Sequence, residues 1–427
     1  MTTARPAPVR IDDYANPRFS PDVQAIHEAV APMAAELRLT AEPILEQAEA
    51  ETGLDVGLDD AGFRERLDVL LTGLRDEAGL SPFGVLSDHT VVLGLLRSRQ
   101  LIRDLLDHHP EILDIPITAP IVIVGLPRTG TSHLHNLISA DPALRSLPYW
   151  EALEPVLPKS ARPAPGEPDP RIASTQVGLD MIDAAAPLFE RMHEMTVDQV
   201  HEEIQLLAID FSSMLFETMA LMPTWRDYYL GHDQTPHYAY LKQVLQVLSW
   251  LRGGERWVLK SPQHCEQIRP LLNVFPDATF VVTHRDPVSV TASVVTMLTY
   301  AARMSVAHPD PVRYGRYWSQ RVEDLLRGCE RDRDLIPDGQ AIDVRFHEFM
   351  ADDLAMVERI YDVAGQPMTA SARGGIEAFL ATHQRGKFGT VVYDLGDFGI
   401  DPAERRDAMR SYSERFRTAD EWTPEAR

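Results

Sequence analysis

Apolar residues recur at the spacing of a helix face through the first quarter of the chain. Between about residues 20 and 110 this spacing occurs twice, in Val23, Ile26, Val30 and Met33 and again in Leu67, Leu70, Leu71 and Leu74. Intervals of three and four residues are the pattern of an amphipathic helix. The same stretch shows no strand-like alternation, so we expect residues 1–115 to form a helical N-terminal region.

The pattern changes abruptly at Pro116. The segment IVIVG at 121–125 is a short β-branched run without a polar face, which is typical of a strand buried on both sides. Similar runs occur at 257–260, 279–284 and 341–346, and a helical stretch follows each of them. Buried strands that alternate with helices predict the α/β class, with a parallel sheet flanked by helices.

A chain of 427 residues is long for one ordinary core, so a large domain with accessory regions is expected. We assign residues 116–400 to the α/β domain and residues 401–427 to a C-terminal tail. A long insertion, residues 154–252, separates the first two of these strands. Its first part, 154–170, carries six prolines and predicts an extended loop, while its later part is rich in Met, Leu, Phe and Trp and predicts helices.

The charge balance limits the classes of partner. The net charge is −23, from 64 acidic and 41 basic residues, and a field of that sign repels nucleic acid while still permitting a local basic pocket. The two cysteines, Cys265 and Cys329, lie far apart in the sequence. This spacing argues against a disulfide framework or a cysteine metal site and fits a reducing compartment.

Two further features bear on the compartment. The first residues lack the apolar run of a signal peptide. The most apolar short run, Ile117 to Leu126, is about ten residues long and contains Pro120, whereas a membrane helix needs about 20 residues. We therefore expect a cytoplasmic protein without stable membrane insertion, and assembly as a homo-oligomer stays open.

The turn after the first strand has the glycine spacing of a phosphate-binding loop. Gly125 and Gly130 bracket it, and a helix is expected to begin at Thr131. The N-terminus of a helix offers unpaired N–H groups and the positive end of the helix dipole, which together bind phosphate. A plain strand-to-helix turn that needs glycine for its geometry is the alternative. Anion binding is favoured because a cation and hydroxyl groups converge on the same turn, in Arg128, Thr129, Thr131 and Ser132.

The turn differs from that of P-loop nucleotide triphosphatases. Those enzymes have Lys at the position of Thr131, and they use an apolar strand that ends in Asp to hold Mg²⁺. Here the run FVVTHRD places His284 and Arg285 after the strand. Phosphoryl transfer normally needs a divalent metal because the transferred group carries much negative charge, whereas a sulfuryl group carries less. The sequence therefore favours a P-loop-like fold without a metal. A kinase or nucleotide triphosphatase, or a non-catalytic nucleotide-binding protein, is the alternative.

A second anion site is predicted after the strand at 279–284. Arg285 follows this strand directly, and Ser293 lies eight residues later in the expected helix. Ligands of open α/β sheets bind at the carboxyl ends of strands, where an Arg fork and a Ser hydroxyl can hold one phosphate. A surface ion pair between Arg285 and Asp286 is the alternative.

The segments at 120–142, 256–293 and 391–400 together resemble the superfamily of sulfotransferases that use 3′-phosphoadenosine 5′-phosphosulfate (PAPS). They are most similar to its bacterial branch and are also similar in these motifs to tyrosylprotein sulfotransferases. The resemblance covers about residues 117–400. It implies that the donor's 5′-phosphosulfate is bound by Arg128, Thr129, Gly130, Thr131 and Ser132, and its 3′-phosphate by Arg285 and Ser293.

The resemblance also implies a basic loop near the 3′-phosphate. Its counterpart here is Arg385, Gly386 and Lys387, which reads Arg-Gly-Lys where cytosolic members of the family have Arg-Lys-Gly. Which of the two cations contacts the donor therefore stays open. A glycine that ends a helix, flanked by solvated cations, is the alternative.

Catalysis needs a cation for the leaving phosphate and a base for the acceptor. The resemblance places the cation at Lys260, at the end of the second predicted strand. Two residues compete as the base, and we favour Glu151, which resembles the catalytic Glu of the tyrosylprotein branch but lies about two residues later. His264 lies near the His of the cytosolic branch. Each could instead be a structural residue of a first helical turn.

The acceptor is the least determined part of the reaction. We expect a small-molecule or lipid acceptor with a hydroxyl or amine group, held in a pocket formed by the N-terminal and inserted helices. The apolar residues between Met214 and Trp225 favour a core but can also line such a pocket. The pairs that begin at His193 and His201 lack the HExxH spacing of a zinc site, so we expect a helix face there, either lining the pocket or solvated.

Overall fold

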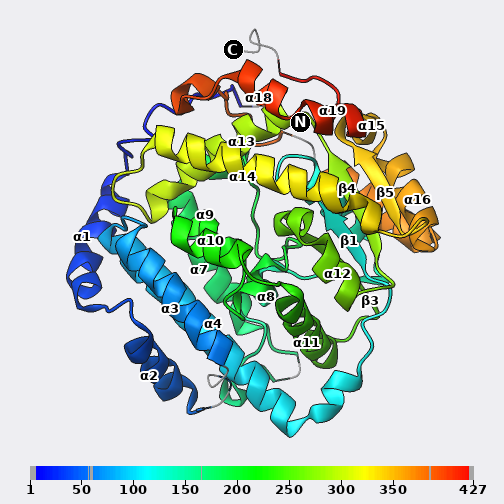
Figure 1. Cartoon of the computed structure of the whole chain (residues 1–427). Coiled ribbons are helices and arrows are strands. Elements are labelled where there is room, and N and C mark those ends of the chain that lie inside the picture. Colours follow the sequence, from blue (N-terminus) through cyan, green and yellow to red (C-terminus); the bar gives the residue numbers. More distant parts are fainter. Residues whose placement is uncertain (1–5, 56, 58–60, 165, 384–385, 423–427) are drawn as a thin grey trace.

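Five parallel strands form the central sheet in the part of the chain that the computed structural model describes, residues 6–55, 57, 61–164, 166–383 and 386–422 (Figure 1). Their order in the sheet is β2-β3-β1-β4-β5. They are β1 (Ile121–Val124), β2 (Leu144–Arg145), β3 (Arg256–Ser261), β4 (Thr279–His284) and β5 (Ala341–Arg345). The predicted α/β class and its parallel sheet are confirmed. The sequence pattern does not predict β2, because a strand of two residues carries no periodicity.

The N-terminal region is helical, as its apolar spacing predicts. Ser20 and Ser81 begin two of its helices by accepting hydrogen bonds from the backbone N–H groups of Val23 (3.3 Å) and Gly84 (3.0 Å). The longest of these helices, α4, packs against α1 and α2. The helices are α1 (Pro21–Glu36), α2 (Ala41–Thr52), α3 (Ala61–Asp76) and α4 (Pro82–His108), followed by the short turn η1 (Pro110–Asp114).

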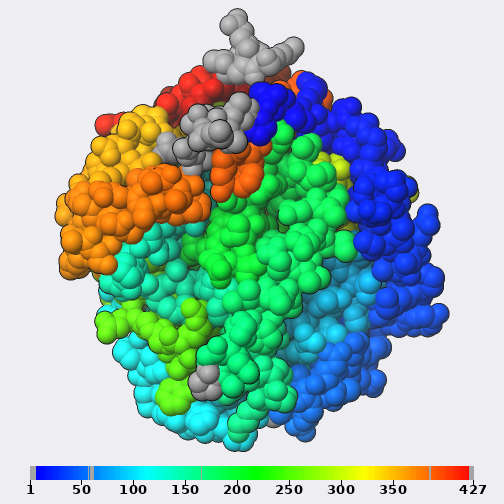
Figure 2. Space-filling model, turned by 180° about the vertical axis from the view of Figure 1, so that it is seen from behind, coloured from blue at the N-terminus to red at the C-terminus, as the bar shows by residue number. Residues whose placement is uncertain are grey.

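The insertion lies between the N-terminal helices and the C-terminal part of the chain, as the green surface in Figure 2 shows. Its proline-rich first part is a loop with one short turn, η2 (Lys159–Ala161). Helix α10 packs on α3, and α11 packs on α8. The helical elements are α7 (Pro170–Ala185), η3 (Phe189–Arg191), α8 (Ile204–Ala208), α9 (Leu215–Met219), α10 (Pro223–Leu230) and α11 (Thr235–Arg252). Residues 192–203 contain no helix.

The other helices follow the strands. After β1 and β2 come α5 (Thr131–Ser139) and α6 (Tyr149–Leu153), and after β3 come η4 (Pro262–Glu266) and α12 (Ile268–Val274). After β4 come α13 (Pro287–Ala301), η5 (Ala302–Met304), α14 (Pro311–Asp332) and η6 (Arg333–Leu335). After β5 come α15 (Phe346–Ala351), α16 (Asp353–Ala364), α17 (Ala370–Thr382), η7 (Leu395–Phe398), α18 (Pro402–Ala408) and α19 (Arg410–Phe416). The described helices include none with the length and apolar character of a membrane span.

The side chains of β1 alternate between two hydrophobic cores. Ile121 and Ile123 pack in a core with residues of α5, α16 and α17, and Val122 and Val124 belong to the larger core on the other face. All four side chains are fully buried. This is the environment that a strand without a polar face predicts.

The register of β1 sets the position of the site. Val124, the last residue of β1, pairs with Ser261 of β3 on one side and with Val282 of β4 on the other. The carboxyl ends of three neighbouring strands therefore meet at one edge of the sheet, where ligands of open α/β sheets bind. The domain boundaries near residues 115 and 400 stay predictions.

Candidate active site

The loop between β1 and α5 has the backbone geometry of an anion-binding turn. Gly130 directly precedes α5 with a φ of 89°, and Arg128 has a φ of 72°, which is uncommon for a residue that carries a side chain. Gly125 is needed for another reason, because a Cβ atom there would lie 1.9 Å from Oγ1 of Thr283. The shape of the loop therefore requires both glycines of the predicted motif.

Hydroxyl groups fix this loop to the sheet. Thr129 donates a hydrogen bond to the carbonyl oxygen of Leu126 at 2.7 Å, and its hydroxyl is 2.7 Å from that of Thr283 on β4. The hydroxyl of Thr131 reaches the same carbonyl oxygen at 3.4 Å. The first N–H groups of α5 lack acceptors within the helix, and such groups bind anions.

The predicted phosphate ligands converge from three elements. Nε of Arg128 donates to Oγ of Ser293 on α13 at 2.9 Å, and Nη1 of Arg285 donates to the carbonyl oxygen of Arg128 at 2.6 Å. The guanidinium group of Arg285 lies 3.9 Å from the ring centre of Phe346. It also forms an ion pair with Glu421 at 2.7 Å, so the alternative pairing with Asp286 is not the one found. Asp286 instead caps α13 by accepting from the N–H of Val288.

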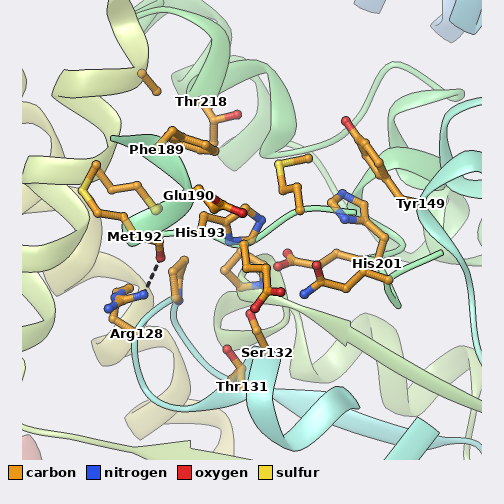
Figure 3. A pocket seen from close by; sticks show the side chains of 18 of the residues that line it. Arg128, Thr131, Ser132, Tyr149, Phe189, Glu190, Met192, His193, His201 and Thr218 are labelled. Carbon is orange, nitrogen blue, oxygen red and sulfur yellow. Dashed lines mark hydrogen bonds between the residues drawn. The ribbon is translucent and has the colours of Figure 1, made fainter. Parts of the chain in front are cut away.

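A cavity of about 1220 Å³ opens at this edge of the sheet. Figure 3 shows Arg128, Thr131 and Ser132 on one side of it and Phe189 and Thr218 on the opposite side. The predicted donor residues that line it are Arg128, Gly130, Thr131, Ser132, Arg285, Gly386 and Lys387. Thr129 and Ser293 do not line it, and they act on it through the contacts with the loop and with Arg128 described above.

The C-terminal basic loop reaches the same cavity. Nζ of Lys387 is 2.5 Å from Oε1 of Glu194, so this cation is paired with a carboxylate that also lines the cavity. Gly386 has a φ of 69°, which fits a tight turn. Arg385 lies outside the described residues.

Lys260 is buried near the end of β3, and both its ammonium group and its backbone N–H have carboxylate partners. Its ammonium group forms an ion pair with Glu202, and its backbone N–H donates to Oε2 of Glu203 at 2.7 Å. Glu202 lines the cavity, whereas Lys260 is not among the lining residues.

Neither predicted base lines the cavity. Glu151 is 1% exposed and forms ion pairs with Arg145 at 2.7 Å and with Arg252 at 2.9 Å. His264 is fully buried, with one ring nitrogen 2.8 Å from the hydroxyl of Tyr238 and the other paired with Glu203. The carboxylate of Glu151 and the imidazole of His264 are thus held by neighbouring side chains inside the protein, as in the structural alternative for each residue.

Among the described residues, four histidines line the cavity, and the sequence pattern predicts none of them as the base: His133, His193, His201 and His383. His193 and His201, both labelled in Figure 3, lie in the insertion. Burial lowers the pKa of His193 to about 3, and the charges of Lys260 and Arg128 contribute to this shift. Burial, with smaller effects of His193 and Lys260, holds the pKa of His201 well below its ordinary value. The expected helix face is not found, because both residues lie in the irregular segment 192–203. Only the fold of the insertion places them here, although their pairing with acidic neighbours drew attention to them.

This arrangement, an anion-binding loop after the first strand and an Arg–Ser pair after the strand beside it, is that of a known enzyme family. The profile of the sulfotransferase family matches residues 120–370, which is more than half of the chain. The chain therefore belongs to the sulfotransferase family. The matched range contains the loop, Lys260, Arg285 and Ser293, and it confirms the resemblance noted in the sequence.

Curated relatives point the same way. Two proteins named omega-hydroxy-beta-dihydromenaquinone-9 sulfotransferase Stf3, from Mycobacterium bovis (strain ATCC BAA-935 / AF2122/97) and from Mycobacterium tuberculosis (strain CDC 1551 / Oshkosh), are each 24% identical to the chain over 259 residues. The match covers 58% of this chain and 62% of each relative, which is less than two thirds of their length.

Solved structures extend the likeness to most of the fold. The sulfotransferase STF1 from Mycobacterium tuberculosis H37Rv is 29% identical, with a TM-score of 0.76 over 87% of this chain and 98% of that one. The sulfotransferase STF9 from Mycobacterium avium is 26% identical, with a TM-score of 0.80 over 91% of this chain and 99% of that one. Because the match to STF1 covers 87% of this chain, the uncovered residues are fewer than those of the N-terminal region, and at least part of that region is matched.

Proposed function

We propose that the protein transfers a sulfuryl group from PAPS to a hydroxyl group, or an amine, of an apolar small-molecule or lipid acceptor. The observation that carries this proposal is one cavity that joins a cationic loop to an apolar wall. Arg128 and Arg285 lie at the loop, and side chains such as Met219 and Leu298 form the wall. The relatives named for a hydroxylated menaquinone support an apolar acceptor.

The donor would be held at two anion sites. The N–H groups at the start of α5, with Arg128 and Ser132, suit the 5′-phosphosulfate, and Arg285 with Ser293 suits the 3′-phosphate. Arg285 is paired with Glu421 in this structure, so binding of the 3′-phosphate would replace one anion by another.

Transfer would proceed in line. The acceptor oxygen forms a bond to sulfur while the bond from sulfur to the bridging oxygen of the 5′-phosphate breaks, and the electron pair of that bond leaves with 3′-phosphoadenosine 5′-phosphate (PAP). Arg128, the loop N–H groups and Lys260 would stabilise the charge that develops on this phosphate. These cations suffice for a sulfuryl group, so we expect EDTA to leave turnover within about two-fold of its original value.

We propose His193, rather than Glu151 or His264, as the base that takes the acceptor proton. It lines the cavity with Arg128 and Ser132, and its lowered pKa keeps the imidazole neutral and able to accept a proton. Burial is the main cause of this low pKa, and the cations Lys260 and Arg128 add to it; bound phosphate and sulfate charges would offset the effect of the cations and raise the pKa.

Two measurements test the proposal. PAP should raise the melting temperature more than ATP with Mg²⁺ does, since a ligand at 100 times its Kd adds about 2.7 kcal/mol of stability. PAPS that carries a radioactive label in its sulfuryl group should transfer this label to a long-chain alcohol. A stronger effect of ATP with Mg²⁺ would indicate the kinase alternative, and PAP binding without transfer to any alcohol, phenol or amine would indicate a non-catalytic protein.

The base is tested with matched variants. His193→Gln should lower kcat by about 10²- to 10⁴-fold while PAP binding persists. His201→Gln serves as the control, because His201 lines the same cavity and, half-buried like His193, lies in the same irregular segment. Equal losses in both variants, or a near-normal rate in His193→Gln, would contradict the assignment.

A further inference from the structure

The cavity continues from the loop into an apolar part between α4, α13 and α14. Ser293, which holds Arg128, and Ala301, which lines this part, are eight residues apart on α13. A helix rises about 1.5 Å per residue, so Ala301 lies about 12 Å further along α13 than Ser293. Its wall includes Val91 of α4, Met297 and Leu298 of α13, and Val322 of α14.

A carboxyl group without a partner lies in this apolar wall. Asp88 of α4 is 2% exposed and lines the cavity. Its Oδ2 atom is buried and accepts no hydrogen bond from any residue that the structure describes. Burial raises the pKa of Asp88 to about 7. Because burial of an unpaired polar group is costly, a carboxyl group in this position is best explained by a ligand that hydrogen-bonds to it.

Two hydrogen-bond donor groups on α14 are also buried without a partner in the part of the chain that the structure describes. Nε1 of Trp318, which lines the cavity, and the hydroxyl of Tyr314, one turn earlier, are buried without a hydrogen-bond partner among the described residues. Burial raises the pKa of Tyr314, and the charge of Asp88 adds to this effect. The charge of Asp88 therefore acts on Tyr314, and Trp318, four residues later, lies on the same face of α14.

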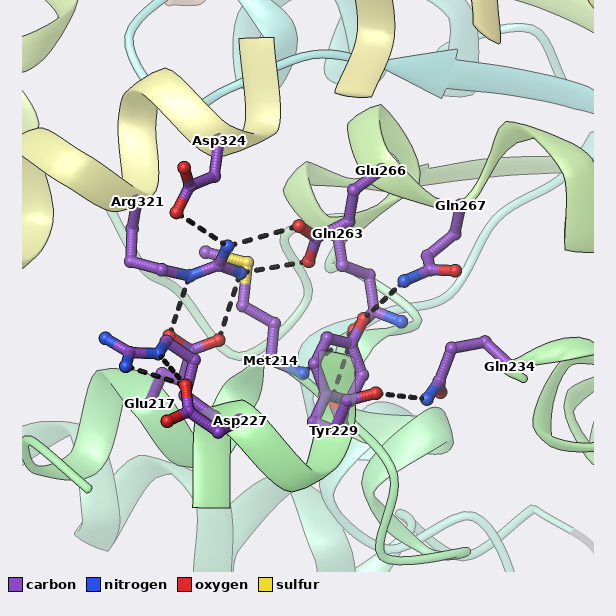
Figure 4. Close-up of polar contacts among 12 residues, drawn as sticks. Met214, Glu217, Asp227, Tyr229, Gln234, Gln263, Glu266, Gln267, Arg321 and Asp324 are labelled. Carbon is purple, nitrogen blue, oxygen red and sulfur yellow. Dashed lines mark hydrogen bonds and ion pairs between the residues drawn. The ribbon is translucent and has the colours of Figure 1, made fainter. Parts of the chain in front are cut away.

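Two other polar side chains on α14, Arg321 and Tyr317, have carboxylate partners, and Figure 4 shows those of Arg321. Arg321 is completely buried and forms ion pairs with Glu217 of α9 and Glu266 of η4, each at 2.9 Å. Tyr317 donates to Glu217 at 2.7 Å. These contacts hold α14 against α9, so the cavity-facing Trp318 is presented on a fixed helix.

We propose that Asp88 and Trp318 form a second polar subsite, which binds a hydroxyl group of the acceptor other than the hydroxyl group that receives the sulfuryl group. The oxygen of such a hydroxyl accepts from Nε1–H of Trp318, and its proton is donated to the carboxylate of Asp88. The acceptor is then an elongated apolar molecule with a hydroxyl group towards each end. This inference rests on the proposed function for the identity of the reacting end.

Terminal diols provide the test. The protein saturated with PAP is titrated with a series of terminal diols of increasing chain length, each compared with the mono-alcohol of the same length. Binding is followed by thermal shift, and label transfer from PAPS is measured separately. We expect one diol to bind about ten-fold more tightly than its mono-alcohol, as one added charge-assisted hydrogen bond allows.

Two variants locate the preference. Asp88→Leu and Trp318→Phe should each reduce the preference for the diol to about three-fold or less, while binding of PAP and of the mono-alcohol is unchanged. Trp318→Phe keeps an aromatic ring but removes the N–H group together with the five-membered ring that carries it, and the mono-alcohol controls for the lost ring area. This variant decides the question if Asp88→Leu does not fold. Equal binding of diols and mono-alcohols by the wild type, binding of neither, or an unchanged preference in the variants overturns the subsite. If the wild type binds a diol more tightly than its mono-alcohol but transfers no label from PAPS to either, the subsite is supported and the proposed function is refuted.

Discussion

The ion pair between Arg285 and Glu421 offers a sharp test of donor binding. Arg285 is the predicted ligand of the 3′-phosphate, yet its guanidinium group donates to Oε2 of Glu421 through both Nε (2.9 Å) and Nη2 (2.7 Å). The third nitrogen, Nη1, donates to the carbonyl oxygen of Arg128, so a phosphate that binds through the Nε–Nη2 edge takes the place of Glu421. Donor binding therefore has to displace Glu421, and Glu421→Gln should tighten PAP binding.

The size of the effect follows from the exposure of the pair. The side chains of Arg285 and Glu421 are 21% and 23% exposed, so solvent screens their attraction. Pairs of this kind contribute about 0.2–1 kcal/mol, which corresponds to a Kd for PAP up to about five-fold lower in Glu421→Gln. Arg285→Ala should instead weaken PAP binding about ten- to a hundred-fold, from the loss of a charge-assisted hydrogen bond of about 1.5–3 kcal/mol.

Calorimetric titration with PAP measures both effects. An analogue without the 3′-phosphate is the control ligand, because neither substitution should change its affinity by more than about two-fold. The gain from Glu421→Gln should vanish when Arg285→Ala is already present, and it should shrink at high salt. Unchanged or weaker PAP binding by Glu421→Gln, or an equal gain for the analogue, would show that Arg285 does not exchange Glu421 for the 3′-phosphate.

Two further predictions concern stability. Arg321→Met removes the cation between Glu217 and Glu266 and leaves two buried carboxylates without it, so the free energy of unfolding in urea should fall by about 3–5 kcal/mol. Arg327→Met is the control, because it removes an exposed ion pair from the same helix and should lower the free energy of unfolding by at most about 1 kcal/mol. Similar losses would contradict the role of the network. Burial, with a smaller effect of Lys260, lowers the pKa of His135 from its ordinary value of 6.5 to about 3. Between these two pH values the unfolded chain binds more protons than the folded chain. The free energy of unfolding therefore falls as the pH drops below about 6.5. The melting temperature of His135→Leu should therefore fall less between about pH 7 and about pH 5 than that of the wild type, and an equal fall would refute a neutral buried imidazole.

Much of the fold and of the donor site could be predicted because the relevant interactions are local. The apolar run of β1 and the glycines of its loop lie within ten residues of each other, so one short segment specifies strand, turn and helix start. Arg285 and Ser293 are also close in sequence, and the helix between them fixes their separation. Elements with weak local signals, such as β2 and the segment 192–203, were beyond this kind of reasoning.

The choice of base depended on contacts between distant segments. Nothing around Glu151 in the sequence indicates that Arg252, about a hundred positions away, supplies one of its two ion pairs. Likewise, the contacts of His264 with Glu203 and Tyr238 come from other parts of the chain. Motif spacing alone therefore favoured residues that the structure places in buried networks away from the cavity.

The α/β class, the helical N-terminal region and the anion-binding loop are readable from the sequence, because hydrophobic periodicity and backbone requirements at single residues act over a few positions. The sulfotransferase family is readable from the resemblance of its motifs, which the family profile confirms. The folded chain is needed to see that His193 rather than Glu151 lines the cavity, that Glu421 pairs with Arg285, and that Asp88 lines the same cavity as Trp318 of α14. Cavities and charge pairs form where remote segments pack together, and their partners cannot be read from either segment alone.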